Sequence, residues 1–371
     1  MTAPPGIPFF PYTQLFLSKE SELLAVMADV CRRGAYILQK DSLEFEKSLA
    51  EFTGARHAFG VANGTDAIII GLKAAGIGPG DEVILPSHTY IATAAAVHMV
   101  GGIPVLAECG ADHMLDPGDI AHRVTSKTKA VMPVHINGRT CDMSAIGRVA
   151  DRHGLMIVED AAQGLGSRFD GRSAGTFGRF GSISFYPAKL LGCFGDGGAI
   201  LTNDDTMAEQ ILLLRDHGRN AEGRVVAWGY NSRLDNLQAA VLGHKLKTFR
   251  EDIDRRRFVA ELYQKGLGDL DELDLPPAPN ADSCHFDVYQ NYEVEADRRD
   301  ELKAYLGQRG IGTIIQWGGT PVHQFRELGF TVDLPRTDRF FERCLMLPMN
   351  VAITDAEVAY VVASVRAFYA A

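Results

Sequence analysis

Three short stretches of the sequence combine residue types that could do chemistry together. The strongest is Ser182-Ile183-Ser184-Phe185-Tyr186-Pro187-Ala188-Lys189, a single lysine in an apolar stretch that continues into four glycines (Gly192, Gly195, Gly197 and Gly198). A buried lysine can lose its proton, attack a carbonyl group and form an imine. The stretch therefore predicts a nucleophilic lysine, and a purely structural lysine is the alternative that it leaves open.

The other two stretches offer a site for an anion and a carboxylate. Asn63-Gly64-Thr65-Asp66 precedes a nearly wholly apolar segment expected to form a helix over 67–75. The free N–H groups at the start of that helix, with Gly64 and Thr65, suit a phosphate. Glu159-Asp160-Ala161-Ala162-Gln163 follows a buried strand, and ligands bind at the carboxyl ends of parallel strands. Each stretch also has a simpler interpretation as a helix N-cap.

One cofactor would use all three stretches. Pyridoxal phosphate (PLP) needs its phosphate anchored, its ring nitrogen kept protonated and its aldehyde held by a lysine. Lys189 would hold the aldehyde, and the carboxylate of Asp160 would favour the proton on the ring nitrogen. Tyr90, just after an apolar strand, could stack on the ring, although an ordinary core aromatic is the alternative. We therefore expect an enzyme that uses PLP.

The pattern of apolar residues predicts two domains. Strands expected at 82–85, 103–106, 130–134 and 155–158 alternate with helices, one of them over 142–153 and ending at Gly154. This alternation predicts an α/β domain over 1–245, with a mostly parallel sheet buried between helices. One long helix over 236–266 comes next. A strand at 288–294, a helix from about Asp297, a strand at 313–317 and a helix capped by Thr354 and Glu357 then predict a smaller α+β domain over 246–371.

Composition excludes several classes of protein. The formal net charge of -10 argues against a nucleic-acid binder, because nothing neutralises a phosphate backbone. The six cysteines form no CxxC pair and no metal-ligand spacing, so we expect reduced thiols and no metal. No stretch has the length of a membrane span. Met1 to Pro11 lacks the features of a signal peptide. We therefore expect a cytoplasmic protein without a membrane partner.

The motifs, in order along nearly the whole chain, resemble those of the DegT/StrS-type sugar-nucleotide aminotransferases. This family is a branch of the aspartate aminotransferase fold, fold type I of the PLP-dependent enzymes, and the resemblance implies that fold here. The matching motifs are Asn63-Gly64-Thr65-Asp66-Ala67, Gly78-Pro79-Gly80-Asp81-Glu82-Val83, Glu159-Asp160-Ala161-Ala162-Gln163, Ser184-Phe185-Tyr186-Pro187-Ala188-Lys189, Gly195-Asp196-Gly197-Gly198 and Tyr230-Asn231-Ser232-Arg233-Leu234-Asp235.

The resemblance also implies a role for individual residues. Lys189 matches the lysine that holds the cofactor as a Schiff base, Asp160 the partner of the ring nitrogen, and Gln163 a ligand of the ring hydroxyl. The remaining cofactor contacts implied are Gly64, Thr65 and Ser184 at the phosphate, Tyr90 on the ring, and Asn231 at the phosphate of the neighbouring subunit in a homodimer. Arg233 and His323 are candidate substrate contacts, with an interface salt bridge and a surface histidine as the alternatives.

The activity that the resemblance implies is transfer of an amino group from L-glutamate to a keto group of a sugar linked to a nucleoside diphosphate, for the biosynthesis of an amino sugar. Similar dehydratases have histidine where this chain has Lys189, so the lysine favours transamination. The form of the lysine loop favours C-3 of the sugar over C-4. A PLP-dependent sugar dehydratase and a non-catalytic regulatory protein remain alternatives.

The sequence departs from the usual family pattern in two places that bear on the substrate. His135-Ile136-Asn137-Gly138 stands where a Leu-Tyr-Gly type of sequence is commoner. Gln316-Trp317-Gly318-Gly319 replaces the usual Tyr-Pro-x-Pro before Pro321-Val322-His323.

Overall fold

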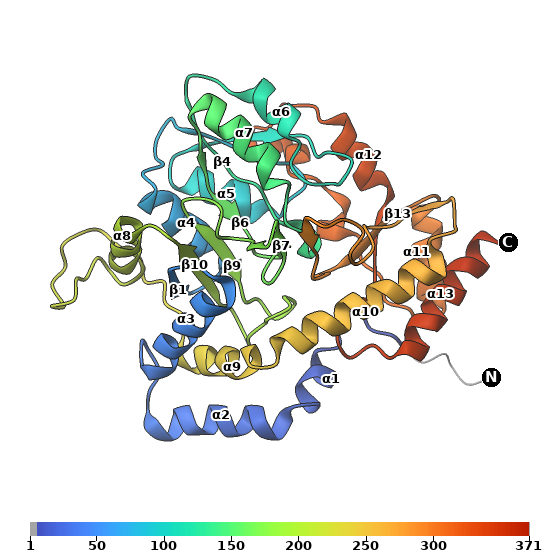
Figure 1. Ribbon diagram of the computed structural model, residues 1–371, viewed down its shortest axis with the longest axis horizontal. Helices are drawn as coiled ribbons and strands as arrows, with labels where there is room; N and C mark the ends of the chain where they lie inside the picture. Colours follow the sequence, from blue (N-terminus) through green and yellow to red (C-terminus); the bar gives the residue numbers. More distant parts are fainter. Residues whose placement is uncertain (1–5, 371) are drawn as a thin grey trace.

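The computed structural model describes residues 6–370 and divides into two regions (Figure 1). Residues 1–5, part of the segment in which we expect no signal peptide, lie outside the described residues, as does residue 371. None of the helices between residues 6 and 370 is long and apolar enough to cross a membrane.

A mixed, mostly parallel sheet forms the centre of the first region. Strands β3-β2-β4-β5 are all parallel, and strands β6-β9-β10-β1 continue the sheet because only Val158 separates β5 from β6. β10 runs antiparallel to both of its neighbours. The strands are β1 (His57–Val61), β2 (Glu82–Pro86), β3 (Ile103–Ala107), β4 (Thr128–Val131), β5 (Met156–Ile157), β6 (Glu159–Asp160), β9 (Gly181–Ser184) and β10 (Gly198–Thr202).

Helices cover both faces of this sheet. α4 packs on β9 and β10 and against α5 and α8, while α3 and α9 pack together on the opposite face, with α2 outside them (Figure 1). α4 is apolar on all sides from Ala67 to Leu72, which fits its burial between the sheet and other helices. The helices are α1 (Tyr12–Leu17), α2 (Glu20–Arg33), α3 (Lys40–Thr53), α4 (Gly64–Ala74), α5 (Ile91–Met99), α6 (Pro117–Arg123), α7 (Met143–His153), α8 (Asp205–Arg215) and α9 (Asn236–Leu246).

The second region has its own sheet and its own core. Its antiparallel sheet β11-β13-β14 packs with three helices around Tyr263, Tyr292 and Val361, and Ile7 from the start of the chain joins this core through a bridge to Ile311. The elements are α10 (Phe249–Leu267), β11 (Leu273–Asp274), β13 (Tyr292–Ala296), α11 (Arg299–Gln308), α12 (Pro335–Arg343), β14 (Cys344–Leu347) and α13 (Asp355–Tyr369). A small sheet β12-β7-β8 connects the regions through β7 (Arg168–Phe169), β8 (Arg172–Ser173) and β12 (His285–Phe286).

Most of the predicted elements are confirmed. The α/β fold with a mostly parallel sheet is correct, α7 ends at Gly154 in the left-handed conformation, and Thr354 and Glu357 form the predicted capping box of α13. The single helix over 236–266 is wrong, because the chain breaks at 247–248 into α9 and α10. The new direction lets Phe249 pack in the core of the first region, with Phe45 and Leu242. The end of α10 packs in the core of the second region.

The strand predicted at 313–317 is also wrong. Residues Gln316–Gly319 form a short 3₁₀ turn, in which Trp317, Gly318 and Gly319 have φ values of +48°, +73° and +81°. A strand requires negative φ at each residue, so this backbone cannot continue one. The third strand of the second sheet is instead β14.

Candidate active site

The sheet brings the three predicted stretches to one edge. β6 ends at Asp160 and β9 at Ser184, while β10 begins at Gly198, which pairs with both Ser184 and Val61 at the end of β1. α4 starts three residues after Val61. The carboxyl ends of β1, β6 and β9 therefore meet at the start of α4, where a ligand of an open α/β sheet is expected to bind.

Asp160 presents a buried carboxylate at this edge. Its side chain accepts hydrogen bonds from the Thr93 hydroxyl at 2.8 Å, the Ala162 N–H at 3.1 Å and the Ser182 hydroxyl at 3.4 Å. All three donors are neutral, and the residue is only 5% exposed. Charge buried in this way is stabilised further by a cation. The arrangement fits a partner that carries a proton on nitrogen.

Its neighbour Glu159 points to the other side of the strand and has a structural role. His135 Nε2 lies 2.9 Å from its carboxylate, and the N–H groups of Gly175 and Gly178 donate to it at 2.7 and 2.6 Å. Because the side chains of a strand alternate, fixing Glu159 in the core directs Asp160 to the opposite face.

Lys189 lies in the loop after β9 and is partly buried. Burial lowers its pKa from the usual 10.5 to about 8, although the nearby charge of Asp160 opposes the shift. A lowered pKa leaves a substantial fraction of the amine neutral near physiological pH, and a neutral amine is a nucleophile. The lysine loop is fixed at several points, among them the Leu190 N–H to Gln290 at 2.7 Å and the contact between Lys245 and the carbonyl of Gly192.

The start of α4 packs tightly on the ends of β9 and β10. A Cβ atom on Gly64 would lie 2.9 Å from Ser184 Cβ, and one on Gly198 would lie 2.4 Å from the backbone of Asn63. Asn63 caps the helix by accepting the N–H of Asp66 at 2.8 Å. Thr65, in the first turn, is partly exposed. A glycine, two hydroxyls and the N-terminus of a buried helix thus lie together, which is an arrangement that suits an anion.

Gln163 and Tyr90 flank this edge. The side-chain oxygen of Gln163 accepts the backbone N–H of Asn137 at 2.9 Å and faces Asn291 Nδ2 at 3.4 Å, which leaves its amide nitrogen to donate elsewhere. Tyr90 precedes α5 and is 56% exposed, so the alternative that it is a core aromatic is wrong. Its ring lies 6.4 Å from that of Trp317, and the two ring planes are tilted by 42°.

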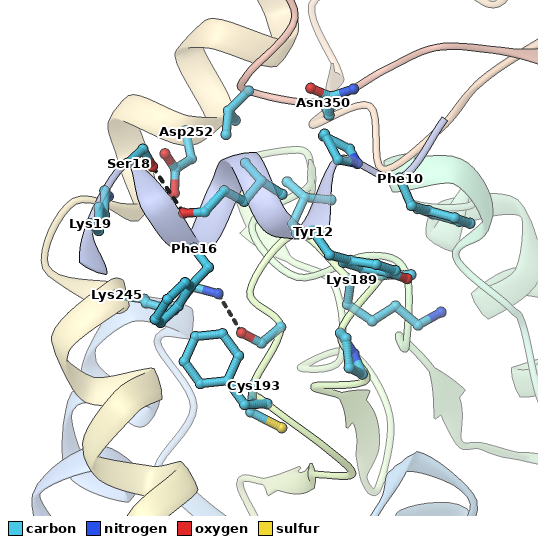
Figure 2. Close-up of a pocket in the computed structure, with 18 of the residues that line it drawn as sticks. Phe10, Tyr12, Phe16, Ser18, Lys19, Lys189, Cys193, Lys245, Asp252 and Asn350 are labelled. Carbon is cyan, nitrogen blue, oxygen red and sulfur yellow. Dashed lines mark hydrogen bonds between the residues drawn. The ribbon is translucent and has the colours of Figure 1, made fainter. Parts of the chain in front are cut away.

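A cleft of about 620 Å³ opens beside Lys189. Its walls come from α1 and α2, from the lysine loop and from α9 and α10, and they combine aromatic side chains with charged groups such as Lys245, Asp252 and Arg256. Figure 2 shows Tyr12 of α1 next to Lys189 on one wall, with Phe10 and Phe16 along the same segment. The N-terminal segment therefore covers one side of the lysine.

Asn231 and Arg233 stand on a different segment, which follows a loop that projects from the molecule at the left of Figure 1. Asn231 is exposed, and Arg233 forms an ion pair with Asp216 at 2.7 Å within the same chain. The loop exposes Val225 (67%) and Trp228 (97%). Apolar side chains that project in this way are typical of an interface with another subunit.

His323 is not a surface histidine, so that alternative is wrong. It is 1% exposed, its Nδ1 lies 2.8 Å from the Ser87 hydroxyl, and its Nε2 lies 2.9 Å from Asp338. Burial lowers its pKa. These contacts pin the segment after the 3₁₀ turn onto the end of β2, and they provide no support for a substrate contact.

Sequence reasoning missed two residues at the site. Thr93 donates to Asp160 at 2.8 Å and also lies 2.6 Å from the Thr89 hydroxyl. Nothing in the order of the residues links Thr93 to a carboxylate 67 positions away. Tyr12 beside Lys189 was missed for the same reason, since the contact depends on how the N-terminal segment folds back.

The residues at this edge fit PLP. The buried carboxylate of Asp160 lacks a cation among its hydrogen-bond donors and suits a protonated ring nitrogen, while the close packing of Gly64 on Ser184 leaves backbone N–H groups and a hydroxyl for a phosphate. Lys189 supplies an amine with a lowered pKa for the aldehyde. The described chain thus offers a group suited to each of the three needs of the cofactor.

Comparison with known proteins agrees with this site. The family model described as the DegT/DnrJ/EryC1/StrS aminotransferase family matches residues 18–366. A dTDP-3-amino-3,4,6-trideoxy-alpha-D-glucose transaminase of Streptomyces venezuelae is 40% identical over 98% of this chain and 96% of its own. A pleiotropic regulatory protein of Geobacillus stearothermophilus is 36% identical over 98% and 99%. The crystal structure of S. venezuelae DesV with a ketimine intermediate, 39% identical, superposes with a TM-score of 0.94 over 98% of each chain. The chain therefore belongs to the DegT/DnrJ/EryC1/StrS aminotransferase family, whose members use PLP.

Proposed function

We propose that this aminotransferase moves the amino group of L-glutamate to a keto group at C-3 of a sugar linked to a nucleoside diphosphate. The observation that carries the proposal is the pairing of Lys189, an amine with a pKa near 8, with the buried carboxylate of Asp160 at one sheet edge. The substrate class comes from the named relative, whose product is a dTDP sugar with an amino group at C-3. The form of the loop around Lys189 favours the same carbon.

The roles of the residues follow from their positions. PLP, when bound, supplies an electron sink for the charge that develops at the reacting carbon. Asp160, held by Thr93, favours the proton on the ring nitrogen, and Gly64, Thr65 and Ser184 bind the phosphate. Lys189 Nζ, once released, would take a proton from the α-carbon of the amino donor and, as a general acid, would deliver a proton to the carbon that carried the aldehyde of the cofactor. Tyr90 stacks on the ring.

The proposal includes a homodimer that shares its active sites. Asn231 and Arg233 follow the projecting loop with the exposed Trp228, and on our proposal this loop packs on the second subunit. Asn231 would then reach the phosphate in the site of the partner, and Arg233, fixed by Asp216, would face the substrate. An isolated monomer would have an incomplete site. We also propose a cytoplasmic location, since all six cysteines are unpaired and two of them, Cys31 and Cys284, are exposed.

The two alternatives make different demands on the site. A dehydratase would not need a lysine that an amino donor displaces from the cofactor, and a regulatory protein, the description given to one relative, would not need Lys189 to titrate near neutral pH. The combination of Lys189, Asp160 and Gln163 supports the aminotransferase, because a protein that only binds has no use for a nucleophile.

The reverse reaction tests the substrate directly. Purified protein would be given 2-oxoglutarate with sugar nucleotides that carry an amino group at C-3 or at C-4, and the L-glutamate formed would be measured. We expect glutamate with a C-3 amino sugar and at least a hundredfold less with its C-4 isomer. Glutamate from the C-4 isomers alone would contradict the choice of carbon, and glutamate from neither class would contradict the sugar-nucleotide substrate.

A further inference from the structure

The two departures from the usual family sequence meet in space at one buried carboxyl group. Asn137, from the first departure, donates from Nδ2 to Glu293 Oε2 at 2.6 Å. Gln316, from the second, donates to both oxygens of Glu293 at 2.9 and 3.0 Å in the amide orientation that satisfies its nitrogen and its oxygen. Glu293 lies on β13 of the second region and is 5% exposed. Side chains that replace the commoner residues thus hold one acid between the regions.

The hydrogen-bond donors to the carboxyl group of Glu293 are the side-chain amides of Asn137 and Gln316. His88 Nε2 lies 3.7 Å from Glu293 Oε2, but burial lowers the pKa of His88 to about 4, so the ring stays neutral. Burial raises the pKa of Glu293 to about 7, an effect that Asn137, His113 and Cys344 oppose and Glu295 reinforces. An amide donor to a carboxylate makes a stronger hydrogen bond than one to a neutral acceptor. Above about pH 7, where Glu293 is ionised, Asn137 is therefore held firmly in one orientation.

A chain of hydrogen bonds leads from this acid to Gln163. With its nitrogen bound to Glu293, Asn137 presents Oδ1 to the side-chain nitrogen of Asn291 at 2.8 Å. The same nitrogen of Asn291 lies 3.4 Å from Gln163 Oε1, which also accepts the backbone N–H of Asn137 at 2.9 Å. A backbone N–H can only donate, so the oxygen of Gln163 must face this network and its NH₂ group must face the site.

The backbone locks the network in place. Asn137 has a φ of +55°, a conformation that asparagine tolerates but most residues avoid. A Cβ on the next residue, Gly138, would lie 2.5 Å from the backbone nitrogen of Gln290, so this loop is in direct contact with the segment that leads into β13. Strained residues held by close packing concentrate at functional sites. The loop therefore cannot shift easily, and the position of the Asn137 side chain is fixed with it.

We propose that Glu293 is a positioning residue that acts through Asn137 and Asn291 on Gln163, and so holds the Gln163 amide nitrogen toward the ring oxygen of bound PLP. The inference deepens the proposed function and rests on the role given there to Gln163. It assigns the two departures of this chain to one purpose, the support of a cofactor contact from the second region. Supporting residues of this kind set the affinity of a bound group through the residue that touches it.

Glu293→Gln tests the proposal, with Glu295→Gln as the matched control on the same strand. The glutamine keeps the shape of the side chain but removes the charge and turns one acceptor into a donor. We expect the dissociation constant of PLP, titrated by absorbance on the cofactor-free protein, to rise about three- to tenfold for Glu293→Gln, the effect of weakening one hydrogen bond. The control should stay within twofold of wild type.

A double-mutant cycle with Gln163→Ala separates positioning from a merely structural effect. If Glu293 acts through Gln163, Glu293→Gln adds less than twofold in the Gln163→Ala background. Suppose that wild type binds PLP. An equal rise of the dissociation constant in both backgrounds, or no rise in a folded Glu293→Gln protein, would then overturn this inference but not the proposed function. A wild type that binds no PLP would overturn the proposed function with it. Should Glu293→Gln fail to fold, Asn137→Gly replaces it in the same cycle, since glycine takes a φ of +55° freely.

Discussion

Replacing Gly64 by alanine tests the anion-binding edge most sharply. The added methyl group would lie 2.9 Å from Ser184 Cβ and 3.3 Å from Ser184 Oγ. Ordinary contact between two carbon atoms needs about 3.5–4.0 Å, so α4 and β9 must separate by roughly 0.6–1.1 Å. Gly64 has no left-handed backbone conformation, so the methyl group is the only change.

The cost to cofactor binding follows from this displacement. A hydrogen bond lengthened from about 2.9 Å by that amount is no longer one by ordinary criteria. Loss of one hydrogen bond to a charged group costs about 1.5–3 kcal/mol, which corresponds to a rise in the dissociation constant of PLP of about 10- to 150-fold. The change in the free energy of unfolding should be smaller for the cofactor-free protein, because the methyl group lies at the surface of a site.

Equilibrium titration of the cofactor-free variant with PLP measures this effect. Gly147→Ala is the control, because its Cβ would meet nothing within 4 Å and it lies inside α7. Alanine there should leave PLP affinity unchanged and stabilise the protein by about 0.5–1 kcal/mol. A Gly64→Ala protein that binds PLP within twofold of wild type would refute the placement of the phosphate at this edge.

Three further predictions follow from the site. Asp160→Asn keeps the shape of the side chain but not its charge, so kcat at full PLP occupancy should fall at least about a hundredfold, as when a proton-holding group is lost; a fall of less than threefold would contradict the role of Asp160. The rate at which PLP attaches to the cofactor-free protein should rise with pH and level off above about 8, because burial lowers the pKa of Lys189 to about 8 and only its neutral form attacks; stopped-flow absorbance that shows no change between pH 7 and 9 would argue against this. Trp228→Ala removes a side chain that is 97% exposed in the single chain, and it should weaken the dimer at least about a hundredfold in analytical ultracentrifugation, whereas Leu328→Ala should not; an unchanged dimer would exclude this loop from the interface.

The parts of the fold that were predicted depend on local signals. The apolar run of α4, the glycine after α7 and the capping pair of α13 are each written within a few residues, and the structure confirms them. The break between α9 and α10 has no proline or glycine to mark it. It arises because Phe249 packs in the core of the first region, and local sequence does not predict such a tertiary contact.

The residues of the site also differ in whether a local signal in the sequence marks them. Lys189, Asp160 and Gly64 sit in short motifs whose residue types suggest their chemistry. The contact of Thr93 with Asp160 and the network from Glu293 to Gln163 join residues from different strands, and no spacing in the sequence predicts them. The burial of His323 could not be predicted either, since its contact with Ser87 and its 2.9 Å approach to Asp338 depend on how the chain folds.

The most direct test of the central claim is the visible absorption spectrum of the purified protein with PLP, before and after L-glutamate, beside Lys189→Ala. The account predicts a yellow band for wild type that bleaches when glutamate is added, because the amino group of the donor passes to the cofactor. Lys189→Ala should show an altered band. A wild-type protein that stays colourless after incubation with PLP, or a Lys189→Ala protein with the same band and the same bleaching, would contradict it.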